Sequence, residues 1–251
     1  MRGLHEAGHE AWLLALQGRK VLWTDGLEIF SRTTLGPEYF GRLGLSGTVH
    51  FKHFESGVRR FQSALHLPYL ALFDSYRMAD AAHHNLRGFD LIHERFNLLA
   101  LGGTLASRKT GIPLVLEVNA DLIEQRKFKG VPERGVRRLF AQWAIKICFS
   151  SAAKVICISA DLRDHLHTRW GLESSKLAVL PCAADVEAFA PRTDASVLRQ
   201  RLGLTKEPVV MWLGGFYPWH DLGLLLESFS LVLQRRPDAR LVLVGDGQTR
   251  E

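Results

Sequence analysis

The chain has 251 residues, of which 47% are apolar and 23% charged, so it can bury a sizeable core and is neither disordered nor collagen-like. At about 150 residues per domain, this length is more than one comfortable domain and less than two full-sized ones. Lys and Arg number 32 against 26 for Asp and Glu. The net charge of +6 favours anionic partners without choosing among nucleic acid, acidic membranes and phosphorylated small molecules.

No segment reaches the roughly 18 uncharged apolar residues that a membrane-spanning helix needs, because the longest candidate, Phe61–Phe73, is interrupted by Pro68. The first ten residues carry charges and lack the apolar core of a secretory signal. The cysteines are odd in number and form no Cys-x-x-Cys pair: Cys148, Cys157 and Cys182. These features predict a cytoplasmic protein in a reducing compartment.

Short strand-like runs alternate with longer segments of helical period, a pattern typical of βαβ units and a parallel sheet. The residues Arg2–Ala7 resemble the end of a helix that stops at Gly8, so the chain is expected to open in the middle of a unit. The expected strands, mostly apolar throughout as in sheets covered on both faces, are His9–Leu16, Phe89–His93, Pro113–Val118, Lys154–Ser159, Lys176–Leu180, Val209–Leu213 and Arg240–Val244. The clearest helices are Glu133–Ala152, Ala160–Arg169, Ser196–Leu202 and Leu222–Arg235.

The predicted domain boundary lies in Pro181–Asp194, where a strand ends at a proline and Ala, Asp and Pro191 precede the next helix. We assign residues 1–181 to a Rossmann-like domain that lacks its first strand, residues 182–195 to a linker, and residues 196–251 to the start of a second domain. Since only two strands and the helix between them follow the linker, the second domain is expected to be incomplete.

Three pairs of histidines could be imagined as metal ligands, but no third ligand stands at a supporting spacing, so we expect surface histidines and no metal. The pairs are His50 and His53, His83 and His84, and His165 and His167. The chain also has no Gly-x-Ser-x-Gly elbow and no recognisable cysteine nucleophile motif. Hydrolase chemistry is therefore not indicated.

Polar side chains stand at the ends of two neighbouring strands of the first domain. His93, Glu94 and Arg95 end one strand, and Leu116–Asp121 ends the next. Two interpretations stay open: a wall that binds sugar hydroxyls or phosphates, or an ion pair of Glu94 with Arg95, or of Glu117 with an arginine, that closes the domain.

A basic stretch leads into an amphipathic helix, whose residues Val136, Leu139, Phe140, Trp143 and Ile147 share one apolar face. The pattern is typical of helices that lie on a membrane surface, and also of core helices with a solvated basic end. Both alternatives stay open. The basic residues that could contact an anionic membrane are Arg126, Lys127, Lys129, Arg134, Arg137 and Arg138.

Two glycine-containing turns follow the strands of the second domain. Gly214 and Gly215 precede His220, Asp221 and a helix, so a ligand can approach the backbone near unpaired N–H groups of the helix start. Gly245-Asp-Gly247 follows the next strand at the same edge. Together the turns suit a phosphate or diphosphate, although Asp221 is also an ordinary N-cap and Asp-Gly an ordinary turn.

Several segments resemble family 4 glycosyltransferases in order and spacing. In the second half these are Val155–Ser159, Val179–Asp185 with Phe189 and Pro191, Leu213–Gly215, Glu227–Phe229 and Pro237–Gly247. Gly8-His9-Glu10 is similar to the entry of that family's second strand, and Glu94-Arg95 with Leu116–Asn119 resembles a bacterial subgroup.

The resemblance implies an α/β fold of the GT-B type, in which two Rossmann-like parallel-sheet domains face each other across a cleft. It implies a hexosyltransferase that moves sugar from a nucleotide-sugar donor to a glycan or lipid-linked acceptor with retention of configuration, in bacterial polysaccharide or glycolipid assembly. No cofactor or metal is expected. The implied localisation is the cytoplasm, including the inner face of the cell membrane.

The resemblance also assigns residues. Donor-binding positions are Gly214, Gly215, His220, Gly245 and Gly247, and acceptor-side positions are Glu94, Arg95 and Asn119. Where the family has an arginine, a lysine and a histidine, this chain has Gly215, His220 and Asn119. The family's first glycine-rich loop would precede Met1 and its acidic catalytic motif would follow Glu251, so the catalytic residues are unknown and these 251 residues alone are expected to be inactive.

Two rival functions remain. A GT-B nucleotide-sugar epimerase would bind the same donor but need no acceptor groove. A non-catalytic basic α/β module would bind an anionic partner; nucleic acid is disfavoured because the positive charge is localised and no recognition motif accompanies it.

Overall fold

The computed structural model describes residues 2–26, 36–67, 70–187, 189–190 and 194–250, so Pro68 and Pro191, named above, lie outside the described residues. The chain divides into two compact units, which we describe separately. Unit 1 comprises Met1–Arg126 and Pro132–Pro181, and unit 2 comprises Lys127–Val131 and Cys182–Glu251. The segment Lys127–Val131, which the sequence assigned to the first domain, falls in unit 2 by this division.

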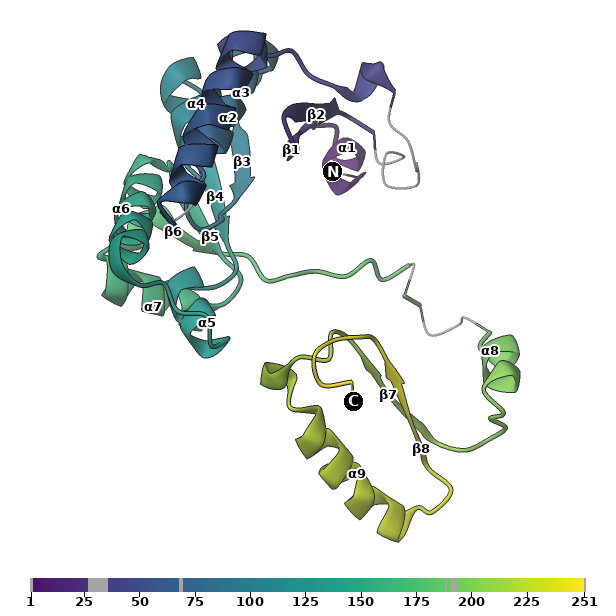
Figure 1. Ribbon diagram of the computed structural model, residues 1–251. Helices are drawn as coiled ribbons and strands as arrows, with labels where there is room; N and C mark the ends of the chain where they lie inside the picture. Colours follow the sequence, from purple (N-terminus) through teal and green to yellow (C-terminus); the bar gives the residue numbers. More distant parts are fainter. Residues whose placement is uncertain (1, 27–35, 68–69, 188, 191–193, 251) are drawn as a thin grey trace. The chain divides into compact units, whose positions relative to one another are not determined.

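Unit 1 is built around a parallel sheet of four strands in the order β3-β4-β5-β6 (Figure 1). Its strands are β3 (Ile92–Arg95), β4 (Leu114–Val118), β5 (Lys154–Cys157) and β6 (Leu177–Val179). The register pairs Ile92 with Leu114, and Leu116 with Val155. The predicted parallel α/β class is confirmed for this unit.

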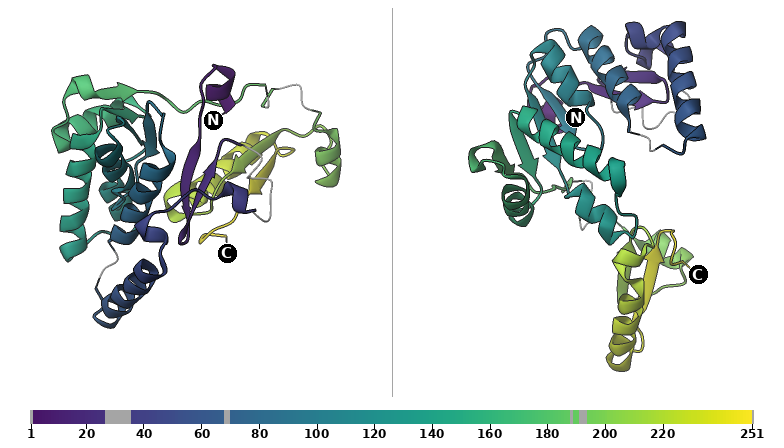
Figure 2. Two further views of the ribbon diagram at one scale, coloured as in Figure 1. Left: turned by 90° about the horizontal axis from the view of Figure 1, so that it is seen from above. Right: turned by 60° about the vertical axis from the view of Figure 1, so that its left-hand side comes forward.

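Helices flank the sheet, as the views of Figures 1 and 2 show. They include α4 (Gly102–Thr110), α6 (Gly135–Ser151) and α7 (Ala160–Trp170), and the unit also contains α2 (Val49–Ala64), α3 (Leu72–Asn85) and α5 (Leu122–Phe128). The core lies between alternate residues of β4 and one face of α6. Leu114, Leu116 and Val118 are fully buried, while the residues between them are only half-buried, so the sheet is not covered equally on its two faces.

The expected first strand differs from the observed one. Residues before it form α1 (Arg2–Glu6), and the strand itself is β1 (Leu13–Gln17), which pairs antiparallel with β2 (Lys20–Thr24) instead of joining the parallel sheet. Gly18, with φ of +60°, occupies the two-residue turn between Gln17 and Lys20, and such a turn makes a local hairpin. The prediction of a parallel strand over His9–Leu16 is therefore wrong.

The strand predicted at Phe89–His93 is also shifted, because β3 begins at Ile92 and runs to Arg95. Pairing with β4 sets this register: Arg95 lies opposite Glu117. Glu94 and Arg95 therefore lie within the strand, and their side chains point to opposite faces of the sheet.

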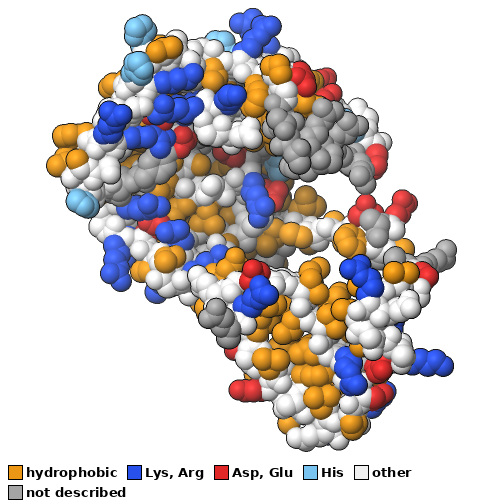
Figure 3. Space-filling model, turned by 45° about the vertical axis from the view of Figure 1, so that its right-hand side comes forward, with side chains coloured by type: hydrophobic (Ala, Val, Ile, Leu, Met, Phe, Trp, Pro, Cys, Tyr) orange, Lys and Arg blue, Asp and Glu red, His pale blue; other side chains and the backbone are white. Residues whose placement is uncertain are grey.

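Unit 2 contains α8 (Ser196–Arg201), β7 (Val209–Leu213), α9 (Leu222–Arg235) and β8 (Arg240–Val244), and the two strands pair in parallel. Both strands match their predicted bounds. Hydrophobic side chains gather on the exposed surface of the lower body in Figure 3, which is this unit. Leu213 is 73% exposed and Met211 62%, because two strands and one long helix cannot cover each other completely.

Within the part of the chain that the structure describes, no helix is both long enough and apolar enough to cross a membrane.

Candidate functional site

The two glycine-containing turns of unit 2 lie against each other at the carboxyl ends of β7 and β8. The Gly214 N–H donates to the Val244 carbonyl at 3.0 Å, and the Phe216 N–H donates to the Asp246 carbonyl at 2.9 Å. The Gly215 N–H, between them, donates to no acceptor among the described residues. Of the N–H groups expected to face a phosphate here, the one of Gly214 is thus engaged and the one of Gly215 is open.

Gly245 and Gly247 are explained by close backbone packing. A Cβ atom at Gly245 would stand 1.9 Å from the Gly214 carbonyl oxygen, and one at Gly247 would stand 2.3 Å from the Phe216 carbonyl oxygen. Backbone atoms cannot move aside as a flexible side chain can. Gly245 and Gly247 therefore allow the two turns to pack closely, and this structural role is independent of any contact with a ligand.

Gly215 has a different neighbour. A Cβ atom there would stand 2.3 Å from a ring carbon of Tyr217, and that ring stacks on Trp219 with centroids 4.6 Å apart. The space where an arginine side chain would begin is thus occupied by an aromatic ring. This explains in physical terms why glycine accompanies Tyr217 in this chain.

His220 closes the loop from the other side. It ends a single 3₁₀ turn, Pro218–His220, and its Nδ1 lies 2.6 Å from the Gly215 carbonyl oxygen. Its ring also contacts the rings of Trp212, Tyr217 and Trp219, with centroids 5.4, 5.9 and 6.0 Å away. These contacts place His220, Gly215 and the open N–H in one small loop.

Asp221 is the N-cap of α9, as its place before the helix predicts. Its Oδ1 accepts from the Leu224 N–H at 3.2 Å, and its backbone is left-handed with φ of +47°. The carboxylate satisfies one N–H of the first turn and adds a negative charge at the helix start. An anion bound near this helix start would therefore be repelled by the Asp221 carboxylate.

The acceptor-side residues of unit 1 do not form a single wall. Glu94 points toward α4, where its Oε1 accepts from the Gly103 N–H at 3.3 Å, whereas His93 and Arg95 lie on the opposite face of β3. Burial raises the pKa of the Glu94 carboxyl even though the Gly103 N–H favours its charged form. A side chain at Gly103 would collide with this carboxyl group, so the glycine makes room for it.

Among the described residues, Glu94 and Glu117 make other contacts than the ion pairs considered from the sequence. Glu117 lies 3.4 Å from His93 Nε2, and the hydrogen bond of Glu94 goes to the backbone of α4. Asn119 follows β4, and its Oδ1 is buried without a hydrogen-bond partner in the described part of the chain. Asn119 is therefore the acceptor-side residue with an open hydrogen-bonding atom.

Asp121, at the end of the same segment, is fully engaged. Its Oδ1 accepts from the N–H groups of Ile123 and Glu124 at the start of α5. Its Oδ2 lies 3.0 to 3.1 Å from nitrogens of His165, Arg169 and Trp170 on α7. The carboxylate joins two helices, so it belongs to the scaffold of the domain and not to a binding wall.

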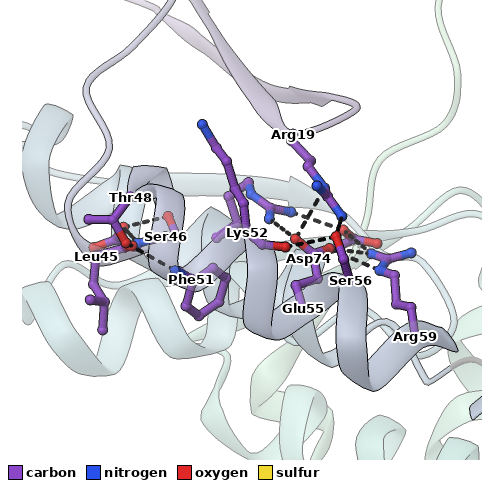
Figure 4. A network of polar contacts seen from close by, with 12 residues as sticks. Arg19, Leu45, Ser46, Thr48, Phe51, Lys52, Glu55, Ser56, Arg59 and Asp74 are labelled. Carbon is purple, nitrogen blue, oxygen red and sulfur yellow. Dashed lines mark hydrogen bonds and ion pairs between the residues drawn. The ribbon is translucent and has the colours of Figure 1, made fainter. Parts of the chain in front are cut away.

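A charged network that the sequence interpretation missed lies between α2, α3 and the β1–β2 turn (Figure 4). Glu55, fully buried, accepts from Arg77 at 2.6 Å and from Arg59 at 2.8 Å, and Arg19 lies 3.3 Å away. Asp74 joins Arg59 and Arg77. The sequence signals were the Glu55–Arg59 and Asp74–Arg77 spacings, which place each pair on one helix face.

These residues line a cavity of about 370 Å³, whose walls are Leu16, Gly18, Arg19, Glu55, Arg59 and Asp74. Burial disfavours the charge of Glu55, but the hydrogen bond and charge of Arg77, with Arg59 and Arg19, outweigh it, so the pKa of Glu55 is lowered. The network therefore holds an ionised carboxylate inside the unit.

The histidines and the cysteines considered from the sequence have ordinary structural surroundings. Among the residues that the structure describes, no three His, Cys, Asp or Glu side chains cluster in a way that could hold a metal ion. His84 and His167 each direct Nδ1 at a backbone carbonyl. Burial raises the pKa of the Cys148 thiol to about 11, so this buried cysteine stays protonated at neutral pH.

The helix α6 presents three of the five residues of its predicted apolar face to solvent. Val136 and Leu139 are each 67% exposed and Trp143 is 49% exposed, whereas the buried face consists of Ala141, Ala144, Ile145, Cys148 and Phe149. Phe140 and Ile147 of that stripe pack against the core, so the stripe is divided between the core and the solvent. Arg126 and Arg137 pair with the buried Glu133, so these two arginines are partly neutralised.

Comparison with known proteins gives the family. The model of Glycosyltransferase Family 4 matches residues 1–188, so the chain belongs to this family. A D-inositol 3-phosphate glycosyltransferase of Streptomyces avermitilis is 25% identical over 244 residues, which are 94% of this chain and 51% of that protein. The UDP-Gal:alpha-D-GlcNAc-diphosphoundecaprenol alpha-1,3-galactosyltransferase of Escherichia coli is 24% identical over 165 residues, 64% of this chain and 41% of that protein.

Among solved structures, Anabaena Alr3699/HepE in complex with UDP and glucose has a TM-score of 0.53 at 22% identity, covering 69% of this chain and 43% of that one. The complex with UDP-glucose gives the same TM-score and covers 75% and 50%. These likenesses show the α/β fold of GT-B glycosyltransferases. The chain spans about half the length of the curated relatives that it matches.

Proposed function

We propose that the protein is a glycosyltransferase that moves a sugar from a nucleotide-sugar donor to a glycan or lipid-linked acceptor, with retention of configuration. The observation that carries the proposal is the match of residues 1–188 to Glycosyltransferase Family 4. It is supported by relatives named as sugar transferases, one of which acts on a diphosphoundecaprenol-linked sugar. By the same family likeness, the reaction needs no metal and no other cofactor.

The proposed donor site is the loop of Gly214, Gly215 and His220 in unit 2. In sugar transfer from a nucleotide donor, negative charge develops on the leaving diphosphate as the glycosidic bond breaks. Fixed hydrogen-bond donors aimed at this charge lower the barrier. The open Gly215 N–H and the His220 ring are the groups here that could act so, whereas Gly245 and Gly247 support them by letting the β8 turn pack closely.

On the acceptor side, we propose Asn119 as the residue that contacts an acceptor hydroxyl. Its buried Oδ1 has no partner among the described residues, and a sugar hydroxyl is a donor that could supply one. Arg95 shares a face of the sheet with His93 on β3 and with Glu117 on β4, and could contact a hydroxyl or phosphate group there. Glu94 is assigned a positioning role toward α4, because its carboxyl group faces Gly103.

We also propose that the protein works in the cytoplasm at the inner face of the cell membrane, with the exposed face of α6 in contact with anionic lipid. Val136, Leu139 and Trp143 supply an apolar stripe, and Arg134, Arg138 and Lys146 are exposed beside it. A basic helix with such a stripe binds at the headgroup level of a bilayer. Lys127 and Lys129 precede this helix in the sequence.

The test is sugar transfer by the protein expressed from its complete reading frame. UDP-, GDP-, ADP- and dTDP-sugars are offered with undecaprenyl-linked and free saccharide acceptors, products are identified by mass, and the new linkage is assigned by NMR. We expect a glycoside with the anomeric configuration of the donor. An inverted linkage would contradict retention, and conversion of the donor to its epimer without any acceptor would favour the epimerase.

A further inference from the structure

The hydrogen bond of His220 determines which ring nitrogen carries a proton. Its Nδ1 lies 2.6 Å from the Gly215 carbonyl oxygen, and a carbonyl oxygen can only accept, so Nδ1 is the protonated nitrogen. In a neutral imidazole the other nitrogen, Nε2, is then a bare acceptor. Only the imidazolium form carries a proton on Nε2 as well.

This tautomer has a consequence for any phosphate oxygen that meets His220. An ionised diphosphate accepts hydrogen bonds and donates none, so it meets a lone pair on the neutral ring but an N–H and a positive charge on the imidazolium. We propose that His220 binds the donor diphosphate only as an imidazolium, so that donor binding takes up a proton at neutral pH and strengthens as the pH falls. This inference rests on the proposed donor site.

The surroundings of His220 make this charge important. Its three ring neighbours are uncharged at neutral pH: Trp212 on β7, Tyr217 on the loop and Trp219 on the 3₁₀ turn. Asp221 follows it and caps α9 with a carboxylate that repels an incoming anion. With a neutral His220 no side chain of the loop of residues 214–221 itself carries a positive charge against this repulsion, whereas an imidazolium offsets it.

Other charged groups lie on the elements packed against the loop, and Asp246, Arg250 and Lys129 each have a partner. Asp246, on the β8 turn, lies 3.4 Å from Arg250, so these two charges largely cancel. Lys129 lies 4.7 Å from the centre of the Trp219 ring, on which it makes a cation–π contact. His220 is the histidine of this loop, and histidine is the side chain whose charge ordinarily changes between about pH 5 and 8.

A lysine at position 220 would behave differently, because its charge does not titrate in this range. It would bind a diphosphate without proton uptake. His220→Lys is therefore the variant that separates a proton-coupled contact from a simple need for positive charge. His220→Gln keeps a polar side chain of similar reach and removes the charge at every pH.

The experiment is calorimetric titration of this chain with UDP-glucose, or with whichever of GDP-, ADP- or dTDP-glucose binds most tightly at pH 5.5. These diphosphate diesters keep a constant charge across the range, whereas free UDP has a terminal phosphate that titrates near pH 6. Each titration is run from pH 5.5 to 8.5 in two buffers of different ionisation enthalpy, which gives the number of protons taken up.

For the unchanged chain we expect affinity to fall by about tenfold or more between pH 5.5 and 8.5, with uptake of up to one proton near neutral pH. His220→Lys should bind with no proton uptake and a flat profile, and His220→Gln should bind weakly at every pH. His53→Gln, at an exposed histidine of α2, is the matched control and should keep the full pH dependence.

Tight binding with a flat profile and no proton uptake in the unchanged chain would overturn the inference and leave the donor-site proposal standing. The same pH dependence in His220→Lys would also overturn it, because another group would then carry the proton. If none of the four nucleotide sugars binds at any pH, both the inference and the donor site are contradicted.

Discussion

At the scale of single residues, Glu55 is the most consequential side chain of unit 1. Its carboxylate, fully buried, is held by Arg77, itself fully buried, and by Arg59. We expect Glu55→Gln to lower the free energy of unfolding by about 3–5 kcal/mol, because it leaves the Arg77 charge buried without its main partner. Urea unfolding followed by circular dichroism measures this, with Glu6→Gln at an exposed site of α1 as the control.

The effect should depend on pH. The pKa of Glu55 in the folded protein is lowered from its ordinary value of 4.5, so its stabilising contribution is fully present above about pH 4.5 and is lost as the pH falls through the lower folded value. The difference in unfolding free energy between the unchanged chain and Glu55→Gln should therefore shrink in acid. A difference that grew below pH 4.5 would contradict the ionised state of this carboxyl.

The glycines of unit 2 allow a matched pair of substitutions. Gly245→Ala places a methyl group against the Gly214 carbonyl oxygen and should cost about 1–3 kcal/mol of stability. Gly223→Ala, in the first turn of α9, meets only Asp221 Oδ1 at 3.6 Å and should be neutral or stabilising by about 0.5–1 kcal/mol. Thermal unfolding followed by the fluorescence of Trp212 and Trp219 compares them, and equal melting temperatures would refute the close packing of the two turns.

The residue types of the candidate donor loop could be predicted from the sequence, but the hydrogen bonds that these residues make within the protein could not. The strand-turn-helix pattern around Gly214 and Gly215 indicated a place for an anion, and Asp221 was identified as an N-cap. That the Gly214 N–H is already bonded to Val244 depends on how two turns distant in sequence meet. The bond between His220 and the Gly215 carbonyl is likewise a matter of three-dimensional geometry.

At the scale of elements, α6 gives a direct test of membrane contact. Removing two exposed charges with Arg138→Gln and Lys146→Gln should weaken binding to acidic vesicles by about fivefold for each charge, since a basic side chain near such a surface contributes about 1 kcal/mol. Trp143→Ala should weaken it further and remove a fluorescence shift on binding. Co-sedimentation with phosphatidylserine and phosphatidylcholine vesicles at low and high salt is the measurement.

The control for charge alone is Arg87→Gln with Lys109→Gln, two exposed basic residues that are not part of α6. This variant should bind acidic vesicles as the unchanged chain does. Equal recovery of the unchanged chain with neutral and acidic vesicles, or equal loss in both double variants, would remove the membrane contact of this helix.

Elements with a strong period were predictable, and those set by tertiary contacts were not. The apolar runs of β7 and β8 and the long helices α6, α7 and α9 appear close to their expected bounds. The helix α2 was not expected, because its inward side carries Glu55 and Arg59, while Phe54 and Phe61 are exposed. The strand β2 was missed although Gly18 between two short apolar runs is a hairpin signal.

At the scale of the whole molecule, the parallel α/β class could be predicted because alternating strands and helices leave clear traces in the sequence. The arrangement of the acceptor-side residues could not be predicted from the sequence. Successive residues of a strand point to opposite faces, so Glu94 and Arg95, adjacent in sequence, are separated by the sheet itself once β3 extends through both.

In the proposed reaction, sugar leaves a nucleotide donor and arrives on an acceptor. The most direct measurement is a mass balance with a donor labelled with ¹³C in its sugar, using the complete protein and a lipid-linked saccharide acceptor. We expect one equivalent of labelled glycoside for each nucleoside diphosphate released, with the donor's anomeric configuration retained. Label that stayed wholly in nucleotide sugar across the donor panel, either unchanged or epimerised, would contradict it.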